Sequence, residues 1–144
     1  MKVAPFLALG FAALASQQVH AASLDIKITN LTQGIYFTPL LIAAHSADTH
    51  LFMPGMTAST ELQAMAEGGN IAGLASIIDA ISGNKVENPA GGLLAPAQST
   101  MSMLETSDAN QYLSITAMML PTNDGFVGLD SWMIPTMPGS YEIY

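Results

Sequence analysis

The sequence contains no cysteine and no arginine, and only 10% of its 144 residues are charged. Without cysteine the chain has neither a disulfide framework nor a thiol nucleophile, which excludes disulfide-stabilised scaffolds and cysteine-based catalysis. With three lysines and no arginine, it also lacks the side chains that clamp phosphate groups or release counterions from nucleic acid. We therefore expect no nucleic-acid partner.

The charge that is present is mostly negative, and the formal net charge is −8. Such a surface repels anionic lipid, whereas its carboxylates suit a hard divalent cation such as Ca²⁺. Hydrophobic residues make up 50% of the chain, which supplies a packed core and argues against disorder. The length suits one domain.

The first 21 residues have the pattern of a secretory signal peptide. A single lysine precedes an apolar run over residues 3–15, and residues 19–21 (Val-His-Ala) fit a small-residue cleavage rule. The apolar run is short for a transmembrane helix, and no charged stop-transfer flank follows it, which disfavours the alternative of an N-terminal membrane anchor.

We expect cleavage after Ala21, with Ala22 as the second choice. The mature chain, residues 22–144, would then hold two lysines and eleven acidic residues. The sequence therefore predicts a secreted or periplasmic domain that has no transmembrane segment once the signal peptide is removed.

Apolar patterning predicts strands on both sides of a helical pair. Strands are expected at residues 24–30, 38–44, 98–105, 112–120 and 126–132. Between the second and third of these, a capping box at Thr60-x-x-Gln63 begins a short helix that Gly68-Gly69 ends. Asn70 caps a second helix, which Gly83 stops. This order predicts an all-β antiparallel sandwich with a short helical insertion between early strands.

The familiar enzyme motifs are absent. There is no G-x-S-x-G elbow and no phosphate loop ending in Gly-Lys-Ser/Thr, so we expect this protein not to be an enzyme. A secreted hydrolase that uses Asp124 and His45 is the weakest alternative, because no activated nucleophile is visible.

Two groups of polar residues each allow a functional and a plain interpretation. His45 and His50 bracket Asp48, and imidazole and carboxylate are zinc ligands, but the five-residue spacing is not helical. The alternative places them in a loop that makes local hydrogen bonds. Glu61 and Glu67 lie on the first predicted helix. They would serve as a general acid and base only if burial split their two pKa values, which nothing in the sequence indicates, so we expect a solvated face.

The most specific segment is residues 118–131, with the sequence MMLPTNDGFVGLDS. Asp124 lies in a polar turn between two strands, next to a glycine that permits unusual dihedral angles. Turn carboxylates and nearby carbonyls can hold Ca²⁺, although Phe126 at the third loop position excludes an EF-hand. The alternative is a plain Asn-Asp-Gly hairpin.

This segment resembles the signature of the spondin N-terminal domain family in its bacterial form. Residues 24–45 (LDIKITNLTQGIYFTPLLIAAH) resemble the opening strand, turn and second strand of the family. Residues 50–74 (HLFMPGMTASTELQAMAEGGNIAGL) resemble its stretch leading into small helices, and residues 93–99 (LLAPAQS) resemble the segment before the next strand.

The resemblance implies a C2-like antiparallel β-sandwich of about eight strands, which in animal relatives belongs to secreted matrix and adhesion proteins. It also implies a calcium site in which Asp124 matches one family ligand. Asp130 is a further candidate that matches no family ligand. The remaining family ligands belong to a later acidic motif, and the sequence stops at Tyr144, about where that motif is expected to begin. We expect this domain to lack its C-terminal end, including a final strand.

Three functions remain open at this point. The first is a secreted or periplasmic binding or adhesion module with a structural calcium site and an unidentified protein or glycan ligand. The second is a metal-free structural envelope protein or a fragment, and the third is the hydrolase described above.

Overall fold

A computed structural model describes residues 21–144, so all of the predicted signal peptide except its last residue lies outside the described range. The strands in this range are β1 (Ser23–Thr29), β2 (Tyr36–Phe37), β3 (Leu41–His45), β4 (Asn84–Glu87), β5 (Ser99–Glu105), β6 (Tyr112–Leu120) and β7 (Phe126–Met133). The helices are α1 (Thr60–Gly68) and α2 (Ala72–Ala80), which follow the early strands. The structure thus confirms a mostly β fold with a short helical insertion.

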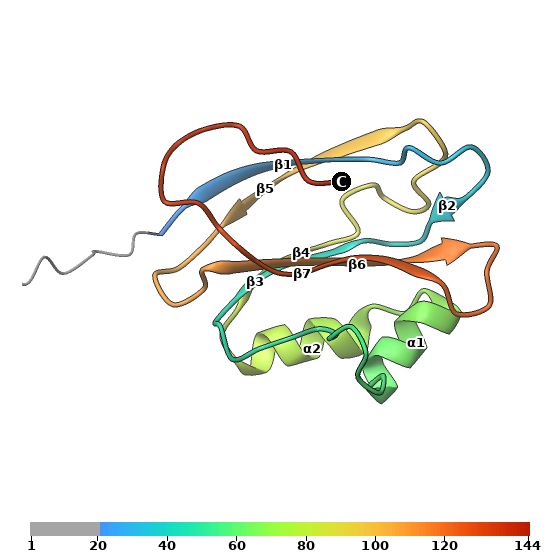
Figure 1. The fold of residues 1–144 in the computed structure, drawn as a ribbon, viewed down its shortest axis with the longest axis horizontal. Coiled ribbons are helices and arrows are strands. Elements are labelled where there is room, and N and C mark those ends of the chain that lie inside the picture. Colours follow the sequence, from blue (N-terminus) through green and yellow to red (C-terminus); the bar gives the residue numbers. More distant parts are fainter. Residues whose placement is uncertain (1–20) are drawn as a thin grey trace, which may run out of the picture.

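The strands form two antiparallel sheets. One sheet consists of β1 and β5, and the other has the order β2-β6-β3-β4, with β7 on the remaining side of β6. The β1–β5 sheet covers one face of the larger sheet, and both helices cover the opposite face (Figure 1). This layered arrangement agrees with the predicted sandwich.

β2 and β3 are two parts of one extended segment that both pair with β6. Phe37 lies opposite Met119 and Leu41 lies opposite Thr116, so four residues along this segment match three along β6. The extra residue falls around Pro39, which cannot donate a backbone hydrogen bond. The predicted strand at 38–44 was therefore wrong at its start, because β3 begins only at Leu41.

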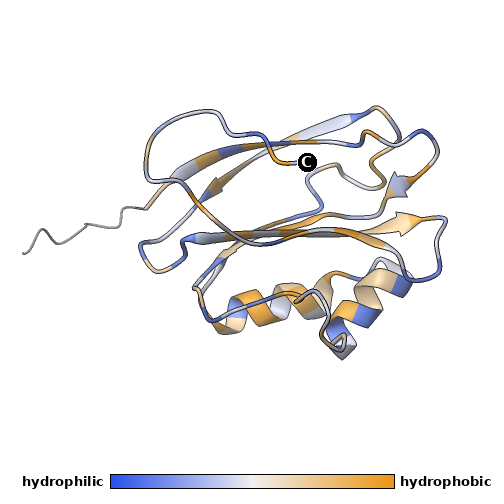
Figure 2. Ribbon diagram, viewed as in Figure 1, coloured by the Kyte–Doolittle hydropathy of each residue, from blue (hydrophilic) through white to orange (hydrophobic). Residues whose placement is uncertain are grey.

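β3 is buried on both faces, which explains its unbroken apolar sequence. Leu41 and Ala43 pack with α1 and α2, whereas Ile42 and Ala44 pack between the two sheets. A strand covered on both sides needs no polar alternation. Figure 2 shows apolar residues on the central strands and on the helices that cover them.

The helix ends agree with the sequence in part. Gly69 ends α1 with a φ of 66°, as predicted. The Asn70 side chain accepts a hydrogen bond from the Ala72 N–H at 3.1 Å, but the N-cap of α2 is Ile71, one residue after the predicted cap. The capping box was misplaced by one residue: Ser59 is the N-cap and accepts from the Leu62 N–H at 3.1 Å. Serine and threonine cap helices by the same hydrogen bond, so the Ser-Thr pair left the position ambiguous.

β4 was not predicted. Its sequence, Asn-Lys-Val-Glu, offers one apolar side chain, Val86, which packs between the sheets. The strand forms because β3 presents a free backbone edge to it, with Ile42 opposite Val86.

Candidate functional site

Asp124 lies in the turn between β6 and β7. The turn is held together from within: the Met119 N–H donates to the Gly125 carbonyl at 2.8 Å, and the Gly125 N–H donates to Thr122 Oγ1 at 3.1 Å. The side chain of Asp124 is exposed, and none of the hydrogen bonds or ion pairs found in residues 21–144 engages its carboxylate. Among the described residues, this carboxylate is therefore exposed and unpaired.

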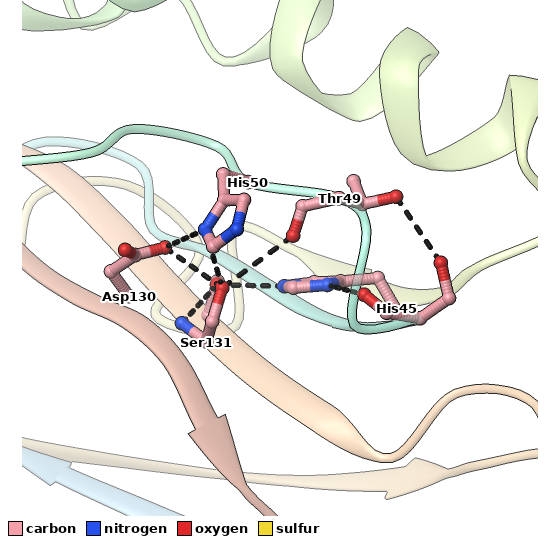
Figure 3. Close-up of polar contacts among 7 residues, drawn as sticks. His45, Thr49, His50, Asp130 and Ser131 are labelled. Carbon is pink, nitrogen blue, oxygen red and sulfur yellow. Dashed lines mark hydrogen bonds and ion pairs between the residues drawn. The ribbon is translucent and has the colours of Figure 1, made fainter. Parts of the chain in front are cut away.

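Asp130 lies at a β-bulge in β7. Leu113 pairs with Trp132 and Ile115 pairs with Leu129, so Asp130 and Ser131 together lie opposite one residue of β6, Ser114. Ser131 has a φ of 48°, a backbone conformation that few non-glycine residues adopt. Bulges redirect side chains, and this one turns Asp130 and Ser131 toward the loop that follows β3 (Figure 3).

The bulge collects a group of polar side chains that we call the bulge cluster. It consists of His45, Ser46, Thr49, His50, Ser114, Asp130 and Ser131.

His50 and the two bulge residues form the exposed part of the cluster. The Ser131 hydroxyl lies 3.0 Å from His50 Nδ1 and 2.9 Å from Asp130 Oδ1, and His50 Nδ1 lies 3.2 Å from the same carboxylate oxygen. The two contacts of His50 join residues 80 and 81 positions apart in the chain, and they fix the loop after β3 onto β7 (Figure 3).

His45 forms the buried part of the cluster. Its Nδ1 lies 2.9 Å from the Ser46 carbonyl, which can only accept, so Nδ1 carries a proton. Its Nε2 lies 2.8 Å from Ser114 Oγ, which itself accepts the Ser131 N–H at 2.9 Å. Every member of this chain of hydrogen bonds is satisfied when the ring is neutral and the Ser114 hydroxyl donates to Nε2.

The surroundings of His45 favour the same neutral state. Burial lowers the pKa of His45 below its usual 6.5, since the side chain has no solvent to stabilise its charge. The Ser46 carbonyl raises the pKa, His50 lowers it and Asp130 raises it, each by less than burial lowers it. The bulge cluster therefore holds one uncharged imidazole in the interior.

The residues around His50 do not have the geometry of a catalytic triad. In a Ser-His-Asp triad the hydroxyl and the carboxylate bind opposite nitrogens of the imidazole, so that a proton can pass between them. Here Ser131 and Asp130 both lie at Nδ1 of His50. The hydrolase pair considered from sequence does not assemble either, because both ring nitrogens of His45 bond to serines and not to Asp124.

The zinc site considered for His45, Asp48 and His50 is not assembled in the structure. His45 was expected in a loop, but it is the last residue of β3 and is completely buried. Asp48 lies exposed in the following loop. Within residues 21–144, no three or more His, Asp or Glu side chains are placed so that they could hold one metal ion. On α1, Glu67 accepts a hydrogen bond from Gln63 at 2.8 Å on an exposed face.

The two candidate calcium ligands lie apart. Asp124 is in the turn before β7, and Asp130 is well along that strand, where His50 and Ser131 already engage it. From Phe126 to Asp130, a strand rise of about 3.3 Å per residue gives roughly 13 Å. The structure therefore does not bring Asp124 and Asp130 to one ion.

Sequence reasoning missed Ser114 and Ser131 as members of a cluster. A serine in a strand carries no pattern of its own, and the bulge that brings both serines together is set by strand pairing. The only local signal was the Asp130-Ser131 pair within the segment that resembles the spondin family.

The two layered antiparallel sheets are those of a β-sandwich domain (Figure 1). The sequence model of the Spondin_N family matches residues 9–141, which is most of the chain. The chain therefore belongs to the spondin N-terminal domain family. This is a non-catalytic family whose members are typically extracellular. No curated protein matches the chain. Neither described helix is long and apolar enough to cross a membrane.

Proposed function

We propose that this protein is a secreted or periplasmic binding module, not an enzyme, whose ligand is a protein or a glycan. The observation that supports this most is membership of the spondin N-terminal family over residues 9–141. The bulge cluster also supports a non-enzymatic role. Its side chains hydrogen-bond to one another, and none of its hydroxyl groups is held by a base in the arrangement of a catalytic triad.

We further propose that the β6–β7 turn binds Ca²⁺ through Asp124. Its carboxylate is exposed and unpaired among the described residues, and the turn around it is already held by Thr122. Ca²⁺ takes 6–8 oxygen ligands, whereas this turn supplies one carboxylate. The described side chains therefore do not enclose the ion, and its other ligands would be carbonyls, water or groups of the bound partner. An open site of this kind suits the weak affinity, about 10⁻⁴–10⁻³ M, of extracellular modules.

Thermal melting in EGTA and in Ca²⁺ tests the metal site. A ligand that binds only the folded state stabilises it by RT ln(1 + [L]/Kd), about 1.4 kcal/mol at ten times Kd. We expect a Ca²⁺-dependent rise in melting temperature that Asp124→Asn removes and Asp130→Asn leaves in place. Identical curves in EGTA and in Ca²⁺ would refute the calcium site and favour the metal-free structural alternative.

A further inference from the structure

The turn between β6 and β7 contains the dipeptide Asp124-Gly125, and in the 144 residues no other aspartate or asparagine precedes a glycine. Glycine has no Cβ, so little shields its backbone nitrogen from the side chain of the residue before it. The peptide unit that joins the two residues turns as one rigid plane about the Cα–C bond of Asp124. One rotation therefore brings the Gly125 nitrogen against the carboxyl carbon of Asp124.

The Asp124 side chain is not held in place. Its carboxyl group is exposed, and no hydrogen bond or ion pair found in residues 21–144 engages it. The C-terminal residues 134–144 border a groove between the sheets that none of residues 118–126 lines. The freedom of this carboxyl group is thus a property of the turn itself.

The Gly125 nitrogen, in contrast, is held by its neighbours. Its N–H donates to Thr122 Oγ1 at 3.1 Å, and the Gly125 carbonyl accepts from the Met119 N–H at 2.8 Å. The Thr122 hydroxyl donates to the Met119 carbonyl, which leaves its lone pairs to accept from Gly125. A Cβ at position 125 would lie 2.8 Å from Thr122 Oγ1, so this hydroxyl packs closely against the glycine. The nitrogen can turn toward the Asp124 carboxyl carbon only when its bond to Thr122 breaks.

We propose that Asp124-Gly125 is a site of spontaneous aspartate isomerisation and that the Thr122 hydroxyl limits its rate. The Gly125 nitrogen attacks Cγ of the protonated Asp124 side chain. A C–N bond forms, and the carboxyl hydroxyl and the amide hydrogen leave together as water. The product is a five-membered succinimide ring.

Water then opens this ring at one of its two C–N bonds. Cleavage at Cγ restores aspartate. Cleavage at the main-chain carbonyl carbon leaves the chain running through Cγ and turns that carbonyl into a free carboxylate, which is isoaspartate. One water leaves and one is added, so the mass is unchanged and no oxidant or reductant is needed.

Isomerisation changes the group that we propose as the calcium ligand. It adds one methylene to the backbone and moves the carboxylate of residue 124 from the side chain to Cα. Asp124 supplies the one carboxylate of this turn, so isoaspartate there removes the Ca²⁺ site. This consequence rests on the proposed function, whereas the isomerisation itself does not.

Ageing of the purified protein in EGTA, at one pH and temperature, tests the role of Thr122. Isoaspartate is measured by peptide mapping and by methylation with an isoaspartyl carboxyl methyltransferase. We expect it at residue 124, forming about tenfold or more faster in urea than in the folded chain, because urea removes the hydrogen bond to Thr122. We expect folded Thr122→Val to isomerise about tenfold faster than wild type, since it lacks that hydrogen bond. Thr122→Ser keeps the hydroxyl and should isomerise at the wild-type rate.

Two controls complete the experiment. Melting curves show that each variant is folded at the ageing temperature, and the exposed Asp108-Ala109 pair serves as an internal reference that should isomerise more slowly, because alanine has a Cβ. Equal rates in the folded chain and in urea, an unchanged rate in folded Thr122→Val, or no isoaspartate at residue 124 even in urea would overturn the proposal.

Melting of the aged protein with and without Ca²⁺ separates this inference from the proposed function. We expect the Ca²⁺-dependent rise in melting temperature to disappear in proportion to the isoaspartate formed. If fresh protein shows no such rise, the calcium site fails while the isomerisation, measured in EGTA, stands. If aged protein rich in isoaspartate keeps the full rise, the consequence for Ca²⁺ binding is refuted.

Discussion

The ring of Phe52 lies directly against the backbone of Gly128: a methyl group at position 128 would approach Phe52 Cζ to 2.6 Å and Cε1 to 2.7 Å. Phe52 also packs edge-to-face on Phe126, with ring centroids 5.1 Å apart. The absence of a side chain at Gly128 thus creates the space in which the loop after β3 contacts β7.

The first prediction concerns this contact. Gly128→Ala should lower the free energy of unfolding by about 1–3 kcal/mol, because the added methyl group forces the Phe52 ring away from its packed position. Chemical denaturation measures the change. Gly34→Ala is the matched control, since a methyl group there would meet no atom within 4 Å. If the two substitutions lowered the free energy of unfolding equally, the clash with Phe52 would not be the cause of the loss at Gly128.

Elements whose apolar pattern lies within their own residues were predictable, as the strands show. β1 alternates exposed and half-buried residues, and β6 and β7 begin where their apolar patterns begin. β4 escaped prediction because Val86 alone carries its apolar signal, and its existence depends on the edge of β3.

The bulge cluster could not be predicted because its geometry depends on distant segments. His45 meets Ser114 across 69 positions, and His50 meets Ser131 across 81. Sequence reasoning recognised both histidines but placed His45 in a loop, since the predicted strand ended at residue 44. The partner, Ser114, is identified only by the register of β3 on β6.

The second prediction concerns the buried hydroxyl of Thr116. Thr116 is completely buried on β6, and within the described residues its Oγ1 has no hydrogen-bond partner. An unsatisfied buried polar group costs about 1–3 kcal/mol, so Thr116→Val should stabilise the fold by about 1 kcal/mol. The melting temperature should rise.

Ser114 provides the contrast for Thr116 on the same strand. It is equally buried, but its hydroxyl bonds to both His45 and the Ser131 N–H. Ser114→Ala should therefore destabilise the fold by about 1–3 kcal/mol, because both partners lose their hydrogen bonds. If Thr116→Val also destabilised, Thr116 Oγ1 would have to be satisfied by a bound water.

The third prediction is a dependence of stability on pH that originates in His45. Burial lowers the pKa of His45 in the folded chain, whereas in the unfolded chain it titrates near 6.5. The unfolded state therefore binds more protons between these two values, and stability from this group is complete above about pH 6.5 and declines as the pH falls toward the folded-state value. Each unit of pKa difference corresponds to about 1.4 kcal/mol.

The pH dependence can be assigned to His45 by comparing variants. Carboxylates also destabilise a fold in acid, so the wild type should be melted from about pH 7.5 to about pH 5.5 beside His45→Gln and His50→Gln. We expect His45→Gln to be less stable at neutral pH but to lose less stability on acidification, because the buried titrating group is gone. His50→Gln keeps His45 in place and should retain most of the wild-type slope. A wild-type slope that persists in His45→Gln would assign the acid sensitivity to other groups and would leave the buried imidazole with a purely structural role.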